Sequence, residues 1–166
     1  MRCIMETYTV SFFGHRHISN SFRADEQIEK IVSDILLNKE YTEFLIGRDG
    51  DFDILAASAI KRTVKKCGYD NSALVLVLPY MKAEYKNNYD SFHDYYDDVE
   101  ICRESSEAHF KAAVQIRNKH MIDRSDLIVC CIEKNSGGAY KSVKYADTIN
   151  KNIINVADSP IFSRTF

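Results

Sequence analysis

The sequence lacks the long apolar runs, the targeting segment and the excess of basic residues that would assign it to several large classes of protein. No apolar stretch is long enough to span a membrane, and residues 1–6 do not resemble a signal peptide. We therefore expect a cytoplasmic protein with no membrane partner. The formal net charge is −2. Because an extended nucleic-acid surface needs an excess of Lys and Arg, this charge predicts that the chain has no such surface.

The five cysteines include no C-x-x-C pair. Zinc sites usually contain closely spaced ligand pairs, so we expect no metal site and no cofactor. Cys130 and Cys131 lie inside the apolar run 127–132, and neighbours on a strand point to opposite faces of a sheet. Both are therefore expected to fill the core rather than to form a redox pair. A G-x-S-x-G motif, which would mark a nucleophilic serine, is also absent from the sequence.

What the chain does contain is an alternation of apolar runs and amphipathic segments. The runs at 8–13, 43–46, 73–78, 127–132 and 153–156 predict buried strands, and 99–101 predicts a short one. Apolar spacing predicts helices over 25–38, 52–67, 106–122 and 138–150, the first capped by Asp25. The segment 80–98, dense in Tyr and Asp, predicts a short helix or a loop whose role stays open.

This alternation predicts an α/β protein with a Rossmann-like three-layer sandwich. We expect a mainly parallel sheet of about five strands, with the strand 8–13 at its centre and right-handed crossovers between strands. The 166 residues show no internal repeat and no low-complexity linker, which predicts a single domain over 1–166.

Two loops that contain glycine follow the first and the last strong apolar runs. The letters SFFGHR span 11–16, and NSGGA spans 135–139. Carboxyl ends of parallel strands meet at one edge of the sheet, where open α/β proteins bind ligands. Glycine allows a ligand to approach the backbone, and free N–H groups at a helix start favour anions. The two loops therefore predict a site for a phosphate-bearing molecule.

Five motifs carry a resemblance to a known family. They are FGHR at 13–16, GRDGDFD at 47–53, LPY at 78–80, RN at 117–118 and SGGA at 136–139. In this order they resemble the SLOG (SMF/DprA–LOG) superfamily, and within it the small stand-alone bacterial proteins of unknown role. The resemblance implies a Rossmann-like fold that binds nucleotides or nucleotide-derived ligands along the carboxyl edge of its sheet. Some members, the Lonely Guy phosphoribohydrolases, cleave the N-glycosidic bond of nucleoside monophosphates.

The chain departs from those hydrolases in one loop. Their motif reads P-G-G-x-G-T-x-x-E, and its glutamate takes part in catalysis. Here the corresponding run ends at Lys144, which stands where the glutamate is expected, whereas Arg117 matches the helix arginine of the hydrolases. This combination favours recognition of a ligand without that reaction.

We expect the phosphate near Gly14 or Gly138, since Asp51 and Asp53 at a helix start would repel it. Arg117 is as well explained by a salt-bridged helix end, and capping of a helix explains most of the Asp49–Asp53 run better than a ligand does. His15 could act as a general acid or base, and His93 is better explained by a solvated acidic face than by a metal site. The expected ligand-binding residues are Gly14, His15, Arg16, Gly47, Asp49, Asp53, Arg117, Asn118, Ser136, Gly137 and Gly138.

Three functions follow from these residues. The first is a binding protein or sensor for a nucleotide-like small molecule, in which Asp49, Asp53 and Asn118 hold the sugar or base. The second is a nucleotide N-glycosidase with a rearranged acid, drawn from Glu100, Glu104 or Asp123. The third is an interaction module that forms a homo-oligomer and binds no small ligand.

Overall fold

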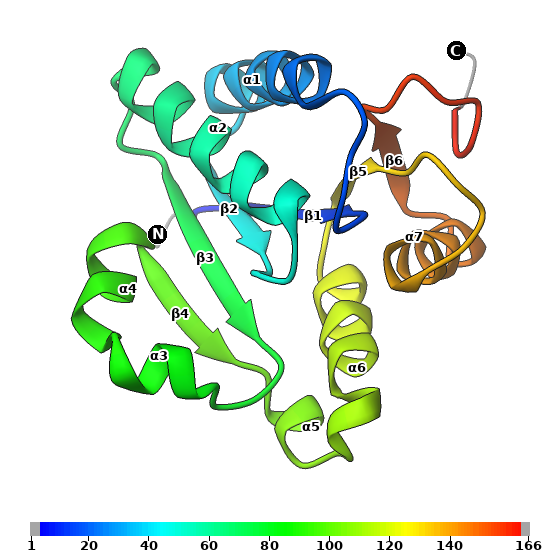
Figure 1. Cartoon of the computed structure of the whole chain (residues 1–166). Coiled ribbons are helices and arrows are strands. Elements are labelled where there is room, and N and C mark those ends of the chain that lie inside the picture. The colour runs from blue at the N-terminus through cyan, green and yellow to red at the C-terminus, as the bar shows by residue number, and fades with distance from the viewer. Residues whose placement is uncertain (1–3, 164–166) are drawn as a thin grey trace.

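The computed structural model describes residues 4–163 and shows one open sheet of parallel strands (Figure 1). The strand order is β4-β3-β2-β1-β5-β6, and every neighbouring pair is parallel. The α/β prediction is confirmed, with six strands rather than about five. The strands are β1 (Thr7–Gly14), β2 (Tyr41–Ile46), β3 (Ser72–Leu78), β4 (Asp98–Ile101), β5 (Leu127–Cys131) and β6 (Asn152–Asn155).

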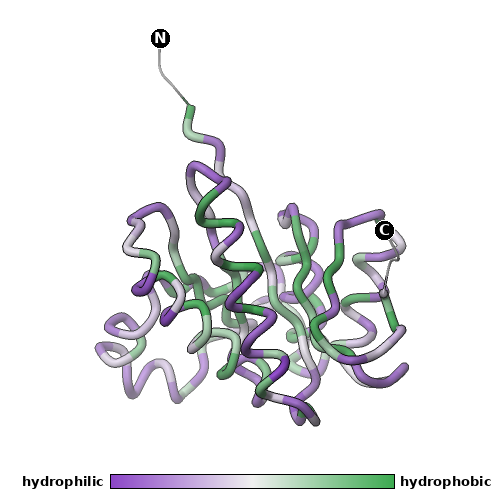
Figure 2. Tube along the Cα trace, turned by 90° about the horizontal axis from the view of Figure 1, so that it is seen from above, coloured by the Kyte–Doolittle hydropathy of each residue, from purple (hydrophilic) through white to green (hydrophobic). Residues whose placement is uncertain are grey.

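Helices cover both faces of this sheet and separate its core into two clusters of buried side chains. One cluster packs under α1 and α2, and the other packs under α6 and α7. Hydrophobic positions accordingly run through the interior of the trace and hydrophilic ones lie on outer turns (Figure 2). The helices are α1 (Ser21–Asn38), α2 (Asp51–Cys67), α3 (Ala83–Asn87), α4 (Tyr89–Tyr95), α5 (Arg103–Ser106), α6 (Phe110–Asp123) and α7 (Gly138–Thr148).

The side-chain alternation of β5 explains the adjacent cysteines. Cys131 belongs to the cluster under α1 and α2, and Cys130 belongs to the cluster under α6 and α7. The prediction that both fill the core is confirmed. Burial raises the pKa of both thiols, that of Cys131 to about 12, so neither is a thiolate at neutral pH.

Helix α1 begins before the position expected from the sequence. Asn20, not Asp25, caps it, and the Asn20 Oδ1 atom accepts a hydrogen bond of 3.0 Å from the Arg23 N–H. The cap was misplaced because Ala24, a small residue one turn before Ile28, belongs to the buried stripe of the helix. A small apolar residue is easily overlooked when a helix is located from its large apolar residues.

The segment 80–98, for which we expected a short helix or a loop, contains α3 and α4. Tyr85, Phe92 and Tyr96 are buried in the core cluster under α1 and α2, where the rings of Phe92 and Tyr96 lie 6.1 Å apart. The Tyr85 hydroxyl and the His93 Nε2 atom form a hydrogen bond of 2.8 Å. The aromatic density of the segment therefore reflects packing. Over residues 4–163, no helix is long and apolar enough to cross a membrane.

Candidate functional site

A cavity of about 360 Å³ opens at the carboxyl edge of the sheet. Strand β1 has β2 on one side and β5 on the other, and the chain reaches β5 only after it has built the β2–β4 side. In open α/β sheets, ligands bind where the direction of strand connection reverses in this way. Gly14 ends β1, Gly138 follows β5, and both line the same cavity, as predicted.

Ten of the eleven residues expected to bind a ligand line this cavity. Ser136 does not line it and is exposed on the loop before α7. The sequence reasoning missed Gln115, which lies two residues before Arg117 on α6. The residues brought together are Gly14, His15, Arg16, Gly47, Asp49, Asp53, Arg117, Asn118, Gly137 and Gly138. That they bind a ligand stays a prediction.

Two glycines are required by the local geometry of the cavity wall. A Cβ atom on Gly14 would lie 2.2 Å from the Phe52 Cγ atom, so the first turn of α2 can approach β1 only because this side chain is absent. Gly137 has a φ of 93°, a backbone conformation that residues with a Cβ rarely adopt. It turns the chain into α7.

The start of α7 presents backbone N–H groups without a side-chain cap. Gly137 is the N-cap residue, and no side chain bonds to the first-turn amides. The Ser142 Oγ atom donates to the Gly138 carbonyl over 3.0 Å, and the Gln115 Nε2 atom donates to the same carbonyl over 3.3 Å. These bonds hold the first turn in place. An uncapped helix start with its positive dipole end favours an anion.

Two side chains after β1 add polar groups without partners to the cavity wall. The imidazole of His15 is 8% exposed, and its Nε2 atom has no hydrogen-bond partner. Burial lowers the pKa of His15, and the charge of Lys134 lowers it further, so the ring is neutral at pH 7. The guanidinium of Arg16 is exposed at the cavity and has no ion-pair or hydrogen-bond partner within residues 4–163.

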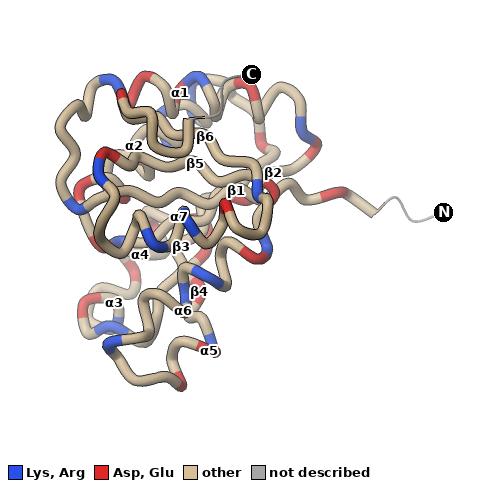
Figure 3. Tube along the Cα trace, turned by 90° about the vertical axis from the view of Figure 1, so that its right-hand side faces the viewer, with Lys and Arg blue, Asp and Glu red and all other residues tan. Residues whose placement is uncertain are grey.

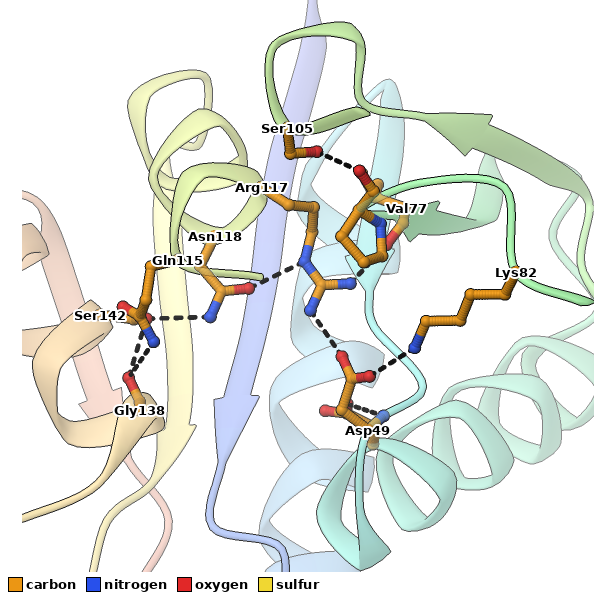
Figure 4. Close-up of polar contacts among 11 residues, drawn as sticks. Asp49, Val77, Lys82, Ser105, Gln115, Arg117, Asn118, Gly138 and Ser142 are labelled. Atoms are coloured by element: carbon orange, nitrogen blue, oxygen red, sulfur yellow. Dashed lines mark hydrogen bonds and ion pairs between the residues drawn. The ribbon is translucent and has the colours of Figure 1, made fainter. Parts of the chain in front are cut away.

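Arg117 is instead committed to the protein itself (Figure 4). Its Nη1 atom donates to the Val77 carbonyl over 2.6 Å, and its Nη2 atom pairs with Asp49 over 2.6 Å. Its Nε atom donates to the Asn118 side chain over 2.9 Å. The guanidinium is 3% exposed, and the salt-bridged alternative therefore describes this residue.

The network around Arg117 extends to both sides of the cavity. Asn118 donates through its Nδ2 atom to the Ser142 Oγ atom over 2.9 Å, which links α6 to α7. Lys82, in the loop after β3, pairs with the second oxygen of Asp49 over 2.7 Å. The loop after β2 is thus tied to β3 and α6 by two cations on one carboxylate (Figure 4).

Asp49 and Asp53 have opposite protonation behaviour although they lie in one loop. Burial alone would raise the pKa of Asp49, but the charges of Arg117 and Lys82 and their hydrogen bonds hold it below its usual value. Burial raises the pKa of Asp53 to about 6, although its Oδ2 atom accepts a hydrogen bond of 2.9 Å from the Asp49 N–H. At neutral pH the Asp49 carboxyl is therefore ionised, whereas the pKa of Asp53 lies only about one unit below the pH.

None of the three alternative acids lies at the cavity. Glu100 pairs with Arg124 over 2.6 Å, Asp123 accepts a hydrogen bond from the Tyr145 hydroxyl, and Glu104 lies next to His120. None of them lines the cavity. The carboxylates that do line it are Asp49 and Asp53.

Comparison with known proteins gives likeness only at the level of structure. No protein-family model matches the chain, and no curated protein matches it. DNA processing protein A (DprA) from Streptococcus pneumoniae superposes with a TM-score of 0.61 at 14% identity, covering 89% of this chain and 49% of that protein. DprA from Helicobacter pylori gives 0.60 at 14% identity, covering 88% of this chain and 63% of that protein. The chain spans about half to under two thirds of these structures.

These likenesses correct one expectation. Figure 3 shows Lys and Arg interspersed with Asp and Glu along the visible trace. From the net charge we expected no extended nucleic-acid surface. That expectation is wrong, because a single-stranded DNA binding mode is described for the Helicobacter pylori protein of the same fold. Net charge averages over the whole chain and does not report on one groove. At the level of the fold, the chain shares the Rossmann-like architecture of these two DprA structures, as the resemblance to the SLOG superfamily led us to expect.

Proposed function

We propose that the chain binds a nucleotide or a nucleotide-derived ligand in the cavity at the carboxyl edge of the sheet. One observation carries the proposal: uncommitted polar groups from three places converge on this cavity. They are the exposed Arg16 and the uncapped first turn of α7 after Gly137, with the His15 Nε2 atom as a third group that has no partner and that donates only when it carries a ring proton. A phosphate group would satisfy donors of this kind through charge-assisted hydrogen bonds.

Other residues that line the cavity suit the sugar of the same ligand. Asp49 and Asn118 are already bonded to Arg117, so their contribution is to fix the shape of the wall. Asp53 uses its Oδ2 atom for the Asp49 N–H, and its Oδ1 atom has no partner in the described chain. We assign Asp53 to a sugar hydroxyl, which can either donate to the carboxylate or accept from its protonated form.

The direct test is calorimetric titration with nucleotides that stabilise the protein in a thermal-shift screen. We expect Arg16→Ala to weaken binding by about 1.5–3 kcal/mol, the range for a hydrogen bond to a charged group. The melting temperature should hardly change, because the Arg16 guanidinium has no partner among residues 4–163. Arg23→Ala, which removes another exposed arginine that does not line the cavity, is the matched control. Unchanged affinity in Arg16→Ala would contradict the proposed place of the phosphate.

A second candidate ligand is single-stranded DNA, favoured by the likeness to the Helicobacter pylori protein. A strand would offer the cavity the same phosphate and sugar groups in repeated form. Fluorescence anisotropy with labelled oligonucleotides distinguishes the two ligands. A strand that contacts several basic residues binds far more tightly than a mononucleotide, and its affinity falls steeply with salt. Equal affinity per nucleotide unit, with little dependence on salt, would identify the mononucleotide as the ligand.

Cytoplasmic location stays a prediction.

A further inference from the structure

Three side chains that commonly ligate metals meet where α5 packs against α6. Cys102 follows β4, Glu104 lies in α5, and His120 lies in the last turn of α6. The Cys102 Sγ atom lies 3.5 Å from the Glu104 Oε2 atom, and the His120 Nδ1 atom lies 3.6 Å from the same oxygen. All three donor atoms lie within 4.8 Å of one another.

These separations are close to those of a tetrahedral zinc site. Bond lengths of about 2.3 Å to sulfur and about 2.0–2.1 Å to nitrogen or oxygen place donor atoms roughly 3.3–3.6 Å apart. Two of the three separations already have this size. The Sγ and Nδ1 atoms lie no more than 4.8 Å apart. A change in side-chain torsion can adjust this separation because Glu104 is exposed and His120 is half-buried.

Hydrogen bonds to its backbone hold Cys102 in place. Cys102 is 5% exposed, and its N–H donates to the Leu78 carbonyl over 2.9 Å, which continues the β3–β4 pairing. The Cys102 carbonyl accepts from the Ser105 hydroxyl over 3.1 Å. One fixed ligand and two adaptable ones can close on an ion without rearrangement of the fold.

We propose that Cys102, Glu104 and His120 bind a divalent transition-metal ion of the zinc class. A thiolate, a carboxylate and a neutral imidazole form a ligand set that suits zinc, and their two negative charges balance the ion. Binding releases the thiol proton of Cys102 to solvent. The fourth position is left to water, because only three ligands are present among residues 4–163. The site is separate from the cavity, since none of the three residues lines it.

Metal binding would connect two elements of the fold. Strand β4 has four residues and lies at the edge of the sheet, and α5 is a single turn that follows it. A metal that joins this turn to His120 would fasten the edge of the sheet to α6. From the absence of C-x-x-C pairs we expected no metal site. This set has no such pair, and the fold brings His120, 16 residues beyond Glu104, to Cys102 and Glu104.

The test is titration of the untagged protein with Co²⁺, whose absorption reports its ligands. The experiment uses a Cys3→Ser, Cys67→Ser background, because Cys67 is half-buried and Cys3 lies outside the described residues. We expect thiolate-to-cobalt charge-transfer absorption and strong visible bands of tetrahedral Co²⁺ at one equivalent. Zn²⁺ should displace Co²⁺, following the order of affinities for such ligands, and should raise the melting temperature.

Variants decide whether the three side chains are the ligands. Glu104→Gln and His120→Ala change exposed or half-buried groups and should fold, and each should weaken binding more than about tenfold, as even partners outside the ligand set do. Cys102→Ser should abolish the charge-transfer band. Glu107→Gln, an exposed acid in the residue after α5, is the matched control and should have no effect. Absence of the band in the folded parent, or full affinity in both Glu104→Gln and His120→Ala, would overturn the proposal.

Discussion

Replacing Asp53 by asparagine should make the protein more stable at neutral pH. Asp53 lines the cavity, and burial raises its pKa from 3.8 to about 6. The folded protein at pH 7 therefore contains a carboxylate that its surroundings disfavour. Asparagine has a similar shape and keeps an oxygen that can accept the hydrogen bond from the Asp49 N–H. The substitution removes the charge and leaves the local bonding intact.

The size of the effect follows from the two pKa values. The interval between 3.8 and about 6 corresponds to about 3 kcal/mol, at about 1.4 kcal/mol per pH unit. The pKa is the net result of all interactions of the carboxylate in the folded protein, including that with the helix start. We therefore expect the free energy of unfolding at pH 7 to rise by about 3 kcal/mol in Asp53→Asn.

The pH dependence gives the sharper test. Because the pKa of Asp53 is raised on folding, the folded state binds the proton more tightly, and the parent loses stability as pH rises from about 4 through about 6. The advantage of Asp53→Asn should therefore be near zero at about pH 4 and reach its full size above about pH 6.

Urea denaturation of both proteins across this pH range measures the difference. Asp51→Asn, at an exposed acid in the same first turn of α2, is the control and should change stability by less than about 0.5 kcal/mol. A loss of stability in Asp53→Asn, or a gain that does not vary with pH, would refute the reasoning.

Three further predictions follow from the same cavity. Gly14→Ala should lower the free energy of unfolding by about 1–3 kcal/mol in urea denaturation, because the new methyl group would meet the Phe52 ring; unchanged stability would contradict this contact. Arg117→Met should cost about 3–5 kcal/mol in the same measurement by leaving Asp49 without its buried partner, and Asp49→Asn in the same chain should recover part of that loss. Nucleoside monophosphates incubated with the protein should release no free base on chromatography, because Lys144 replaces the glutamate that the hydrolases use and is exposed outside the cavity; robust release that is lost in Asp53→Asn would favour the glycosidase instead.

The elements of the fold were predictable where sequence periodicity reports burial directly. The strand Leu127–Cys131 is buried on both faces, so its letters are continuously apolar and identify it without any knowledge of its neighbours. Gly14 and Gly138 could be placed at one cavity for a related reason, since the carboxyl ends of neighbouring parallel strands share an edge. These inferences need only the spacing of apolar residues along the sequence and the topology of parallel sheets.

The properties of individual site residues could not be predicted in this way. Arg117 is bonded to Asp49, which lies 68 residues earlier, and nothing in the local sequence of either residue indicates the pair. The raised pKa of Asp53 depends on what covers it, and the contacts of Cys102 with Glu104 and His120 depend on how α5 packs against α6. Ion pairs, protonation states and sets of metal ligands depend on tertiary contacts, whereas the pattern of apolar residues along the sequence reports mainly secondary structure.

The cavity is closed by two parts of the chain that are made at very different times during translation. Gly14 and Arg16 leave the ribosome more than a hundred residues before the turn at Gly137 and Gly138. Until that turn appears and α7 docks, the cavity lacks the backbone donors at the start of α7, and a nascent chain gains less stability from a ligand than the folded chain does. A ligand present in the cell would therefore stabilise mainly the folded chain and would do less to guide the folding of the nascent chain.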